Sequence, residues 1–220
     1  MRRIVLALLA MFAVAMIVPS AGAQSQNFIR VMHASPDAPN VDVFVNGQAV
    51  LTDVPFFAYS DYLTLGDGTY EVAISPTGQG TDASVWVGEL TVQGGVYGTV
   101  AAVNFVENLD AVLYDDDVSP VPAGNARVRI IHASPNAPAV DVKLAGTDTV
   151  VLANAPYRAS AYLEVPAGTY QFDISPAGSS DVVFTTPALT FLDGWTYTLV
   201  ATGDLNENFW VQSRVDRTGQ

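Results

Sequence analysis

The sequence contains one unit written twice. A phrase at Arg30 reads Arg-Val-Met-His-Ala-Ser-Pro-Asp-Ala-Pro-Asn-Val-Asp-Val, and it returns at Arg129 as Arg-Ile-Ile-His-Ala-Ser-Pro-Asn-Ala-Pro-Ala-Val-Asp-Val. Shorter matches follow in the same order, pairing Gly68-Thr-Tyr with Gly168-Thr-Tyr, Ser75-Pro with Ser175-Pro, and Tyr97 with Tyr197. An internal repeat decides the domain plan before any other feature is considered. We therefore expect two tandem copies of one domain.

Alternation of apolar residues predicts that both copies are built from strands. Apart from the first residues of the chain, no window carries the apolar stripe of a helix, whereas a period of two recurs throughout. Because side chains on a strand point to opposite faces in turn, each alternating set should face a core. The matched inward sets are Ile29 and Val31 with Val128 and Ile130; Val41, Val43 and Val45 with Val140, Val142 and Leu144; and Tyr70, Val72 and Ile74 with Tyr170, Phe172 and Ile174.

Turn residues between these segments narrow the fold class. Asn46-Gly47 supplies two residues that tolerate positive φ, which predicts a type I′ hairpin over residues 40–54. About seven short strands in roughly 95 residues indicate an antiparallel β-sandwich, immunoglobulin-like or transthyretin-like. The Gly-Thr-Tyr strand entries at Gly68 and Gly168 are similar to those of transthyretin-like repeat modules and favour that topology. The fold class is therefore all-β, with two tandem antiparallel β-sandwich domains.

The first residues of the chain have the pattern of a signal peptide. Arg2 and Arg3 precede an apolar run that ends in Ala21-Gly-Ala, so we expect a signal peptide over 1–23 with cleavage near Ala23-Gln24. The mature protein is then expected to be secreted, or to lie at the cell surface or in the periplasm. Whether it is released or retained at the envelope stays open. The expected domains are a first β-sandwich over 24–117, a linker over 118–126 and a second β-sandwich over 127–220.

The doubled His-Ala-Ser-Pro phrase, together with the Gly-Thr-Tyr and Ser-Pro that follow it, resembles the bacterial domain of unknown function 4397 family of exported proteins. Both copies fit this resemblance, which implies an extracellular or cell-surface β-module. The family supplies no reaction, substrate or catalytic residue to carry over. The resemblance therefore implies architecture and leaves activity open.

Charge and composition exclude several classes of partner. The formal net charge is −13, and Arg30 is the only basic residue within residues 27–117, so nucleic acid and anionic lipid are not expected to bind. No stretch after the signal approaches the roughly 20 apolar residues of a membrane span. The chain has no Cys, so each domain must be stable without disulfides. The acidity serves solubility or attracts cations or a basic partner.

The two His-Ala-Ser-Pro turns hold the candidate functional residues. His33 and His132 continue the inward alternation, so each ring is expected to hydrogen-bond the turn that follows it. A secreted hydrolase using His33, Ser35 and an aspartate is the alternative, although Pro36 follows the serine and no nucleophile elbow is present. The candidate binding residues are His33, Ser35, Asp37 and Asp42, with their counterparts His132, Ser134, Asn136 and Asp141.

The acidic residues elsewhere in the sequence are candidates for ion pairs and for calcium binding. Arg30 and Asp42 alternate outward, as do Arg129 and Asp141, so a cross-strand ion pair is expected in each copy; in the rival interpretation Asp42 joins Asp37 in a ligand-binding edge. Calcium is a candidate at Asp204-Leu-Asn-Glu-Asn and at residues 115–117, but neither forms a complete motif, and solvated charge is the favoured interpretation. No metal site and no cofactor are expected.

Aromatic residues beside prolines offer a further candidate surface. Pro55-Phe-Phe-Ala-Tyr and Pro156-Tyr could stack on a sugar or peptide, or could plug the end of a sandwich. The first functional hypothesis is accordingly a non-enzymatic module with a protein or glycan ligand, binding or structural at the cell surface or in the extracellular matrix. Duplication suits this hypothesis because two linked copies of a weak site gain avidity. The hydrolase of the His-Ala-Ser-Pro turn remains the competing hypothesis.

Overall fold

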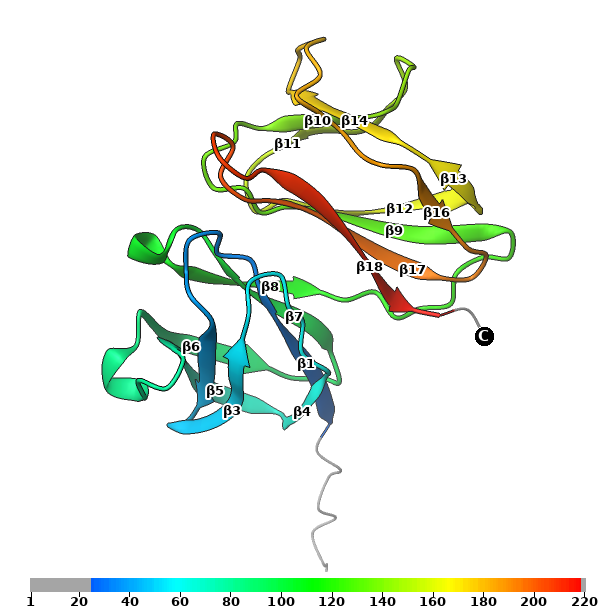
Figure 1. Ribbon diagram of the computed structural model, residues 1–220. Helices are drawn as coiled ribbons and strands as arrows, with labels where there is room; N and C mark the ends of the chain where they lie inside the picture. The colour runs from blue at the N-terminus through cyan, green and yellow to red at the C-terminus, as the bar shows by residue number, and fades with distance from the viewer. Residues whose placement is uncertain (1–24, 219–220) are drawn as a thin grey trace, which may run out of the picture.

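The computed structural model describes residues 25–218, and the predicted signal peptide lies outside this range. Nearly all regular structure in these residues is β-strand (Figure 1). The two short helices within residues 25–218 are three-residue 3-10 turns, η1 (Thr81–Ala83) and η2 (Val106–Asn108). No helix in the described part of the chain is long and apolar enough to cross a membrane. The expected all-β fold class is confirmed.

The first repeat forms eight strands. They are β1 (Gln26–His33), β2 (Val41–Val45), β3 (Gln48–Val54), β4 (Leu63–Gly66), β5 (Gly68–Pro76), β6 (Trp86–Val92), β7 (Tyr97–Val103) and β8 (Asp110–Asp115). They pair into two four-stranded sheets, β4-β1-β7-β8 and β3-β2-β5-β6. The expected hairpin is present, since β2 pairs antiparallel with β3 and the turn has φ 49° at Asn46 and 77° at Gly47.

The second repeat has the same arrangement with two strands interrupted. Its strands are β9 (Asn125–His132), β10 (Val140–Leu144), β11 (Val150–Ala155), β12 (Ser160–Pro166), β13 (Gly168–Tyr170), β14 (Phe172–Pro176), β15 (Phe184–Thr185), β16 (Leu189–Phe191), β17 (Thr196–Thr202) and β18 (Trp210–Arg217). The sheets are β12-β9-β17-β18 and β11-β10-β14-β15, with β13-β16 as a separate pair. The edge strand is divided into β15 and β16 at Pro187, because proline has no N–H to donate to the neighbouring strand. Beside this break the Phe172 N–H donates to the side-chain oxygen Thr186 Oγ1.

Strand order distinguishes the two topologies that the sequence left open. In the immunoglobulin order the first strand lies beside the second, whereas here β1 lies between β4 and β7. The immunoglobulin order is therefore not the observed one, and the transthyretin-like alternative remains. The sheets are antiparallel except that β1 runs parallel to β7 and β9 runs parallel to β17. A parallel pair needs a long connection, and these partners are far apart in the chain.

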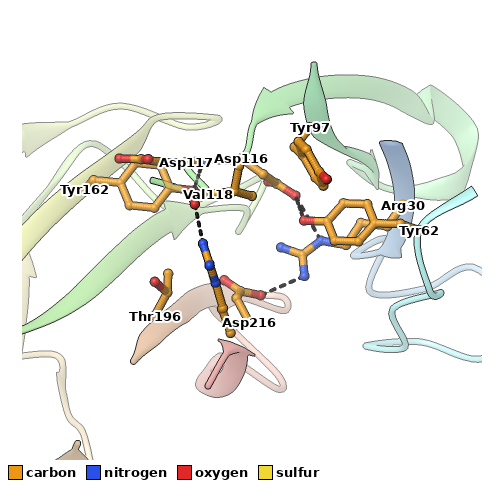
Figure 2. Close-up of a pocket in the computed structure, with 10 residues that line it drawn as sticks. Arg30, Tyr62, Tyr97, Asp116, Asp117, Val118, Tyr162, Thr196 and Asp216 are labelled. Atoms are coloured by element: carbon orange, nitrogen blue, oxygen red, sulfur yellow. Dashed lines mark hydrogen bonds and ion pairs between the residues drawn. The ribbon is translucent and has the colours of Figure 1, made fainter. Parts of the chain in front are cut away.

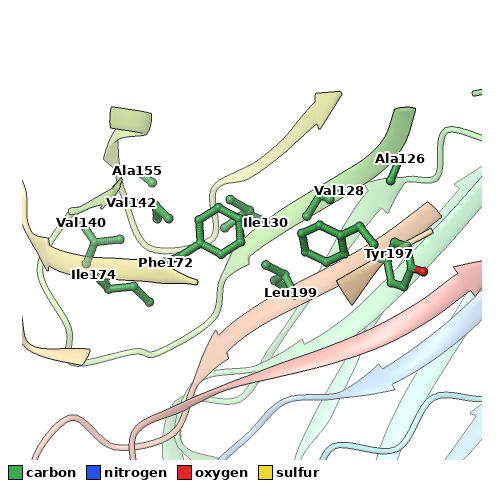
Figure 3. Close-up of a cluster of buried hydrophobic side chains, with 11 residues drawn as sticks. Ala126, Val128, Ile130, Val140, Val142, Ala155, Phe172, Ile174, Tyr197 and Leu199 are labelled. Atoms are coloured by element: carbon green, nitrogen blue, oxygen red, sulfur yellow. The ribbon is translucent and has the colours of Figure 1, made fainter. Parts of the chain in front are cut away.

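Most of the predicted inward residues form the cores, whereas Leu144 is half-buried and lies outside the core clusters. In the first repeat Ile29, Val31 and Val43 are buried at 3%, 6% and 3% exposure. In the second repeat one larger cluster fills the space between the sheets (Figure 3). Its buried members include Val128, Ile130, Val140, Val142, Phe172, Ile174 and Leu199. Alternation thus identified the faces that the two sheets of each repeat turn toward each other.

One sequence match between the repeats is displaced by a residue. Strand pairing places Tyr97 opposite Phe28 and Thr196 opposite Arg127, the counterpart of Phe28. The structural counterpart of Tyr97 is therefore Thr196, and pairing Tyr97 with Tyr197 is wrong. Because successive residues of a strand face opposite ways, Tyr197 enters the core with Phe191 while Tyr97 faces away from it.

The expected ion pair between Arg30 and Asp42 is also wrong. Asp42 is buried, and its two carboxylate oxygens accept from the backbone N–H groups of Asp53 and Gly78 at 2.8 Å each. Asp141 accepts in the same way from Asn154 at 2.7 Å and Gly178 at 2.8 Å. These backbone hydrogen bonds lower the pKa of both carboxyls. Each aspartate therefore ties its hairpin to the turn after the neighbouring strand.

We expect Asp42→Ala to destabilise the protein by about 2 kcal/mol or more, because two backbone N–H groups lose charged acceptors. Urea unfolding monitored by tryptophan fluorescence measures the change. Asp82→Ala is the matched control, since Asp82 is exposed and its carboxylate makes no hydrogen bond within residues 25–218. Equal unfolding midpoints for the two variants would contradict this role for Asp42.

Candidate binding site between the repeats

The two repeats pack through the outer faces of two sheets. Sheet β4-β1-β7-β8 of the first repeat meets sheet β12-β9-β17-β18 of the second (Figure 1). One apolar cluster crosses the junction and contains Met32, Ala34, Ala101, Val103, Tyr114, Ile131, Ala133 and Val200. Polar contacts also cross it, among them an ion pair between Arg158 and Asp110 at 2.7 Å and a hydrogen bond from Thr202 Oγ1 to Ala34 O at 3.3 Å. The outward face of one sheet in each repeat is therefore covered by the other repeat.

Four charged residues form a buried cluster at one end of this junction; we call Arg30, Asp116, Arg129 and Asp216 the ion cluster. Arg30 Nε lies 3.1 Å from Asp116 Oδ2, and Arg30 Nη1 lies 2.8 Å from Asp216 Oδ1. Arg129 Nη1 lies 2.6 Å from Asp116 Oδ1. The side chains are 0–9% exposed. Arg30 and Asp116 belong to the first repeat, so two of these contacts join the repeats.

Threonine and tyrosine side chains complete the ion cluster. Arg30 Nε donates to Thr99 Oγ1 at 2.8 Å, and Arg129 Nε donates to Thr198 Oγ1 at 3.0 Å. Each threonine hydroxyl donates in turn to the aspartate of its own repeat. Tyr62 and Tyr162 lie against the two guanidinium groups at 5.1 and 5.4 Å. Both halves of the ion cluster are therefore built from equivalent positions of the two repeats.

A pocket of about 370 Å³ opens beside the ion cluster, between the repeats (Figure 2). Its wall consists of Arg30, Tyr62, Tyr97, Asp116, Asp117, Val118, Tyr162, Thr196, Asp216 and Arg217. Tyr62 donates to Asp116 Oδ2 at 2.5 Å, and burial together with this bond raises the pKa of the Tyr62 phenol. Tyr162 Oη accepts from the backbone N–H of Asp117 at 3.1 Å. Two of the three tyrosines are thus held in place by hydrogen bonds.

The pocket exists because the repeats differ at one pair of positions. In the first repeat Tyr97 projects from the start of β7 and its ring stacks on Phe28 with centroids 4.5 Å apart. In the second repeat the smaller Thr196 stands at the equivalent place. Thr196 is 3% exposed, and its buried hydroxyl has no hydrogen-bond partner within residues 25–218. Buried hydroxyls are usually paired, and those of Tyr59, Tyr114, Tyr157 and Ser175 also lack a partner within residues 25–218; of these five hydroxyls, that of Thr196 belongs to the pocket wall.

The histidines of the His-Ala-Ser-Pro turns hydrogen-bond the following turn, as expected. His33 Nε2 contacts Pro39 O at 3.1 Å, and its Nδ1 accepts from the Ser35 N–H at 3.3 Å. His132 Nε2 contacts Pro138 O at 3.0 Å. The first contact requires a proton on Nε2, so His33 has both ring nitrogens engaged. Burial lowers the pKa of both histidines.

The serines of these turns bond to other groups. Ser35 Oγ donates weakly to Asp37 at 3.5 Å, and Asp37 accepts the backbone N–H of Val106 at 2.7 Å. Ser134 Oγ donates to Gly203 O at 2.7 Å. Asn136 replaces Asp37 and bonds to Asp204 at 2.9 Å and to the Leu205 N–H at 2.9 Å. No hydrogen bond joins a serine hydroxyl to a histidine ring in the described part of the chain.

The acidic segments proposed for calcium have other partners. Asp116 is buried in the ion cluster, so the interpretation of residues 115–117 as solvated charge is wrong at that position. Asp117 lies 3.1 Å from Arg127 and accepts from the Ser119 hydroxyl, and the Ser119 bonds together with Arg127 lower its pKa. Asp204 accepts from Asn136 and the Asn206 N–H. Within residues 25–218 no three His, Cys, Asp or Glu side chains are placed to hold a metal ion.

The aromatic residues beside the prolines lie mainly against the junction. Phe57 and Tyr59 pack on the apolar cluster between the repeats, and Tyr59 lies 5.3 Å from Arg30. The Phe56 and His33 rings are nearly perpendicular with centroids 5.9 Å apart, and the Tyr157 and His132 rings are nearly perpendicular with centroids 6.2 Å apart. Phe57 and Tyr59 therefore cover part of the junction between the repeats, a place that neither expected role described.

None of the eight candidate binding residues lines the pocket. Sequence patterns do not identify its tyrosines as a group, and they predict Asp42 rather than Asp116 and Asp216 as the partner of Arg30. One signal was available, because Arg30, Tyr62 and Asp116 each recur in the second repeat as Arg129, Tyr162 and Asp216. Outward residues that a duplication keeps on both copies are candidates for the surface where the copies meet.

We expect Asp216→Asn to destabilise the protein by about 3–5 kcal/mol, because it leaves a buried arginine uncompensated. The control replaces the whole ion cluster by Arg30→Met, Arg129→Met, Asp116→Leu and Asp216→Leu. Removing all four charges together should cost less than removing one, since no unpaired charge remains. Guanidinium unfolding measures both variants. A single variant as stable as the unaltered protein would refute this account of the ion cluster.

Stability should fall on mild acidification because of the buried histidines. Burial lowers their pKa, so the unfolded chain binds protons more readily and stability is complete only above the unfolded value of about 6.5. We expect the urea midpoint to drop between about pH 7.5 and about pH 5.5. The double variant His33→Gln, His132→Gln keeps an N–H donor near each proline carbonyl and should show a smaller drop. An unchanged pH dependence in that variant would assign the effect to other groups.

Comparisons with known proteins identify the family to which this chain belongs. No curated protein matches the chain. The Bacillus anthracis TIE protein is 14% identical with a TM-score of 0.26, and the match covers 81% of this chain but only 34% of that one, about a third of its length. A second structure, titled "Alpha-glucan binding by a streptococcal virulence factor", is 14% identical with a TM-score of 0.27 and covers 84% and 96%. These scores are too low to support an inference. The model of the family described as "Domain of unknown function (DUF4397)" matches residues 27–143, more than half of the chain, and the protein therefore belongs to this family.

Proposed function

We propose that the protein is a secreted, non-enzymatic binding module whose ligand site is the pocket between its two repeats. The observation that carries this proposal is Thr196, a residue 3% exposed whose buried hydroxyl has no partner within residues 25–218, in the wall of a pocket of about 370 Å³. Ligand pockets commonly lie at domain interfaces and present a few polar groups among apolar ones. A ligand hydroxyl or carbonyl would satisfy Thr196.

Binding is favoured over hydrolysis by the state of the reactive groups. The buried Ser35 hydroxyl contacts Asp37, and both ring nitrogens of His33 have other partners. A serine nucleophile needs a base within hydrogen-bond reach. The hydrolase alternative has its own test, a serine-directed fluorophosphonate probe: labelling that disappears in Ser35→Ala would support the enzyme and contradict the binding module.

Export and the domain boundaries stay proposals. The basic start and apolar run of residues 1–23 support secretion, with a place at the cell surface, in the matrix or in the periplasm. The repeats would comprise 24–117 and 127–220, joined through 118–126. Asp117 and Val118, where the first repeat meets this connector, lie in the pocket wall, so the connector would position the site as well as join the domains.

We expect the fluorescently labelled full protein to remain on washed cells or isolated envelope of its source, and Thr196→Tyr to abolish this retention. Tyrosine fills the equivalent place in the first repeat, so it should block the pocket without unfolding the chain. Trp210→Ala is the control, because Trp210 is an exposed aromatic outside the pocket wall. Retention that survives Thr196→Tyr, or none by the unaltered protein, would overturn the proposed site and role.

A further inference from the structure

We propose that the pocket between the repeats binds a neutral carbohydrate, about one or two sugar rings of a glycan. This inference rests on the proposed function, since it names the ligand class of the same site. Three properties of the pocket wall support it: the pairing of its charges, the arrangement of its aromatic rings and its unpaired polar groups.

Four of the five charged side chains of the wall are paired with an opposite charge. Arg30, Asp116 and Asp216 neutralise one another and Arg129 in the ion cluster. Asp117 lies 3.1 Å from Arg127, and Arg217 donates to the backbone carbonyl of Val118. Only Arg217, which donates to a neutral carbonyl and keeps its charge, could meet a phosphate or carboxylate without displacing a paired aspartate, and a cation would meet Arg30. A neutral ligand disturbs none of these pairs.

The rings of the wall suit a flat ligand with an apolar face. The Tyr62 and Tyr97 rings are nearly perpendicular, at 85° with centroids 5.5 Å apart, so they form a corner. Tyr162 lies across the pocket from this corner, on the second repeat (Figure 2). A sugar ring presents C–H groups on its faces and hydroxyls at its rim, and aromatic side chains give large contact area to such amphipathic surfaces.

The free polar groups of the wall match hydroxyls. The Thr196 hydroxyl can both donate and accept, as each sugar hydroxyl can. Arg30 uses Nε and Nη1 in the ion cluster, and its Nη2 makes no hydrogen bond or ion pair within residues 25–218. A neutral oxygen acceptor could take this donor without altering the charge balance.

The volume sets the size of the ligand. About 370 Å³ is near the lower end of the range of roughly 300–1,000 Å³ for small-molecule pockets. This space is suited to the end of a glycan chain or one of its side branches more than to a folded protein segment. Because both repeats supply the wall, the carbohydrate would also hold them together, and the ligand should stabilise the docked arrangement.

The test measures binding of the full protein to sugars by titration calorimetry and thermal shift. The probes are glucose, galactose, maltose and cellobiose, an array of neutral oligosaccharides, and two charged analogues, glucuronate and glucosamine. We expect at least one neutral sugar to bind and to raise the melting temperature, and the charged analogue of a bound monosaccharide to bind at least about tenfold more weakly.

Two variants assign the binding to this pocket. Thr196→Val removes the hydroxyl at nearly constant volume and should weaken binding about fivefold to tenfold without loss of stability, since it also removes an unpaired buried group. Thr196→Tyr should abolish binding, whereas Trp210→Ala should leave it unchanged. Loss of binding in Trp210→Ala with retention in Thr196→Tyr would move the sugar to the exposed tryptophan and overturn the inference.

The outcomes separate this inference from the proposed function. If no neutral sugar binds while envelope retention is lost in Thr196→Tyr, the module binds through the pocket but its ligand is not a neutral carbohydrate. If neither sugars nor envelope are bound, both proposals fail. Stronger binding of glucuronate or glucosamine than of the neutral sugars would overturn the charge argument directly.

Discussion

The arrangement of this molecule depends on a buried ion cluster with one arginine and one aspartate from each repeat. Arg30 contacts the aspartates of both repeats, and Arg129 Nη1 contacts Asp116 across the junction. A buried charge is strongly unfavourable unless it is paired, so these residues stabilise the protein only when the two sheets meet in one register. The apolar cluster beside them supplies contact area, but apolar surfaces alone fix a register weakly. Burial of the apolar cluster favours contact between the two repeats, and the ion cluster favours one alignment of their sheets.

A departure from the duplication then produces the candidate site. Tyr97 and Thr196 occupy equivalent places, and only the tyrosine fills its side of the junction. Arg127 replaces Phe28 at the neighbouring position and contacts Asp117, Glu164 and the carbonyl of Ser119. The second repeat thus uses these two positions to open a pocket and to anchor the connector that forms part of its wall.

Much of each repeat could be predicted from the sequence because the relevant forces act locally. The inward valines, the hairpin at Asn46-Gly47 and the bonds from the histidine rings to the next turn all follow from alternation, backbone preference and the need to pair buried polar groups. The failures share one cause. Alternation states on which face Arg30 and Asp42 lie, but not what covers that face. Asp42 is taken by backbone groups of two turns, and Arg30 by the other repeat.

The sequence by itself determined the all-β fold, the duplication and the inward faces of three strands in each repeat, since period-two alternation and turn residues act between neighbours in the chain. Only the tertiary structure decided the strand order, the partners of Arg30 and the position of the pocket. The pocket wall combines β1, the segment before β4, the start of β7, the connector, and β12, β17 and β18 of the second repeat. Those segments are distant in sequence, and the free energy that brings them together comes from docking two sheets, which no local pattern encodes.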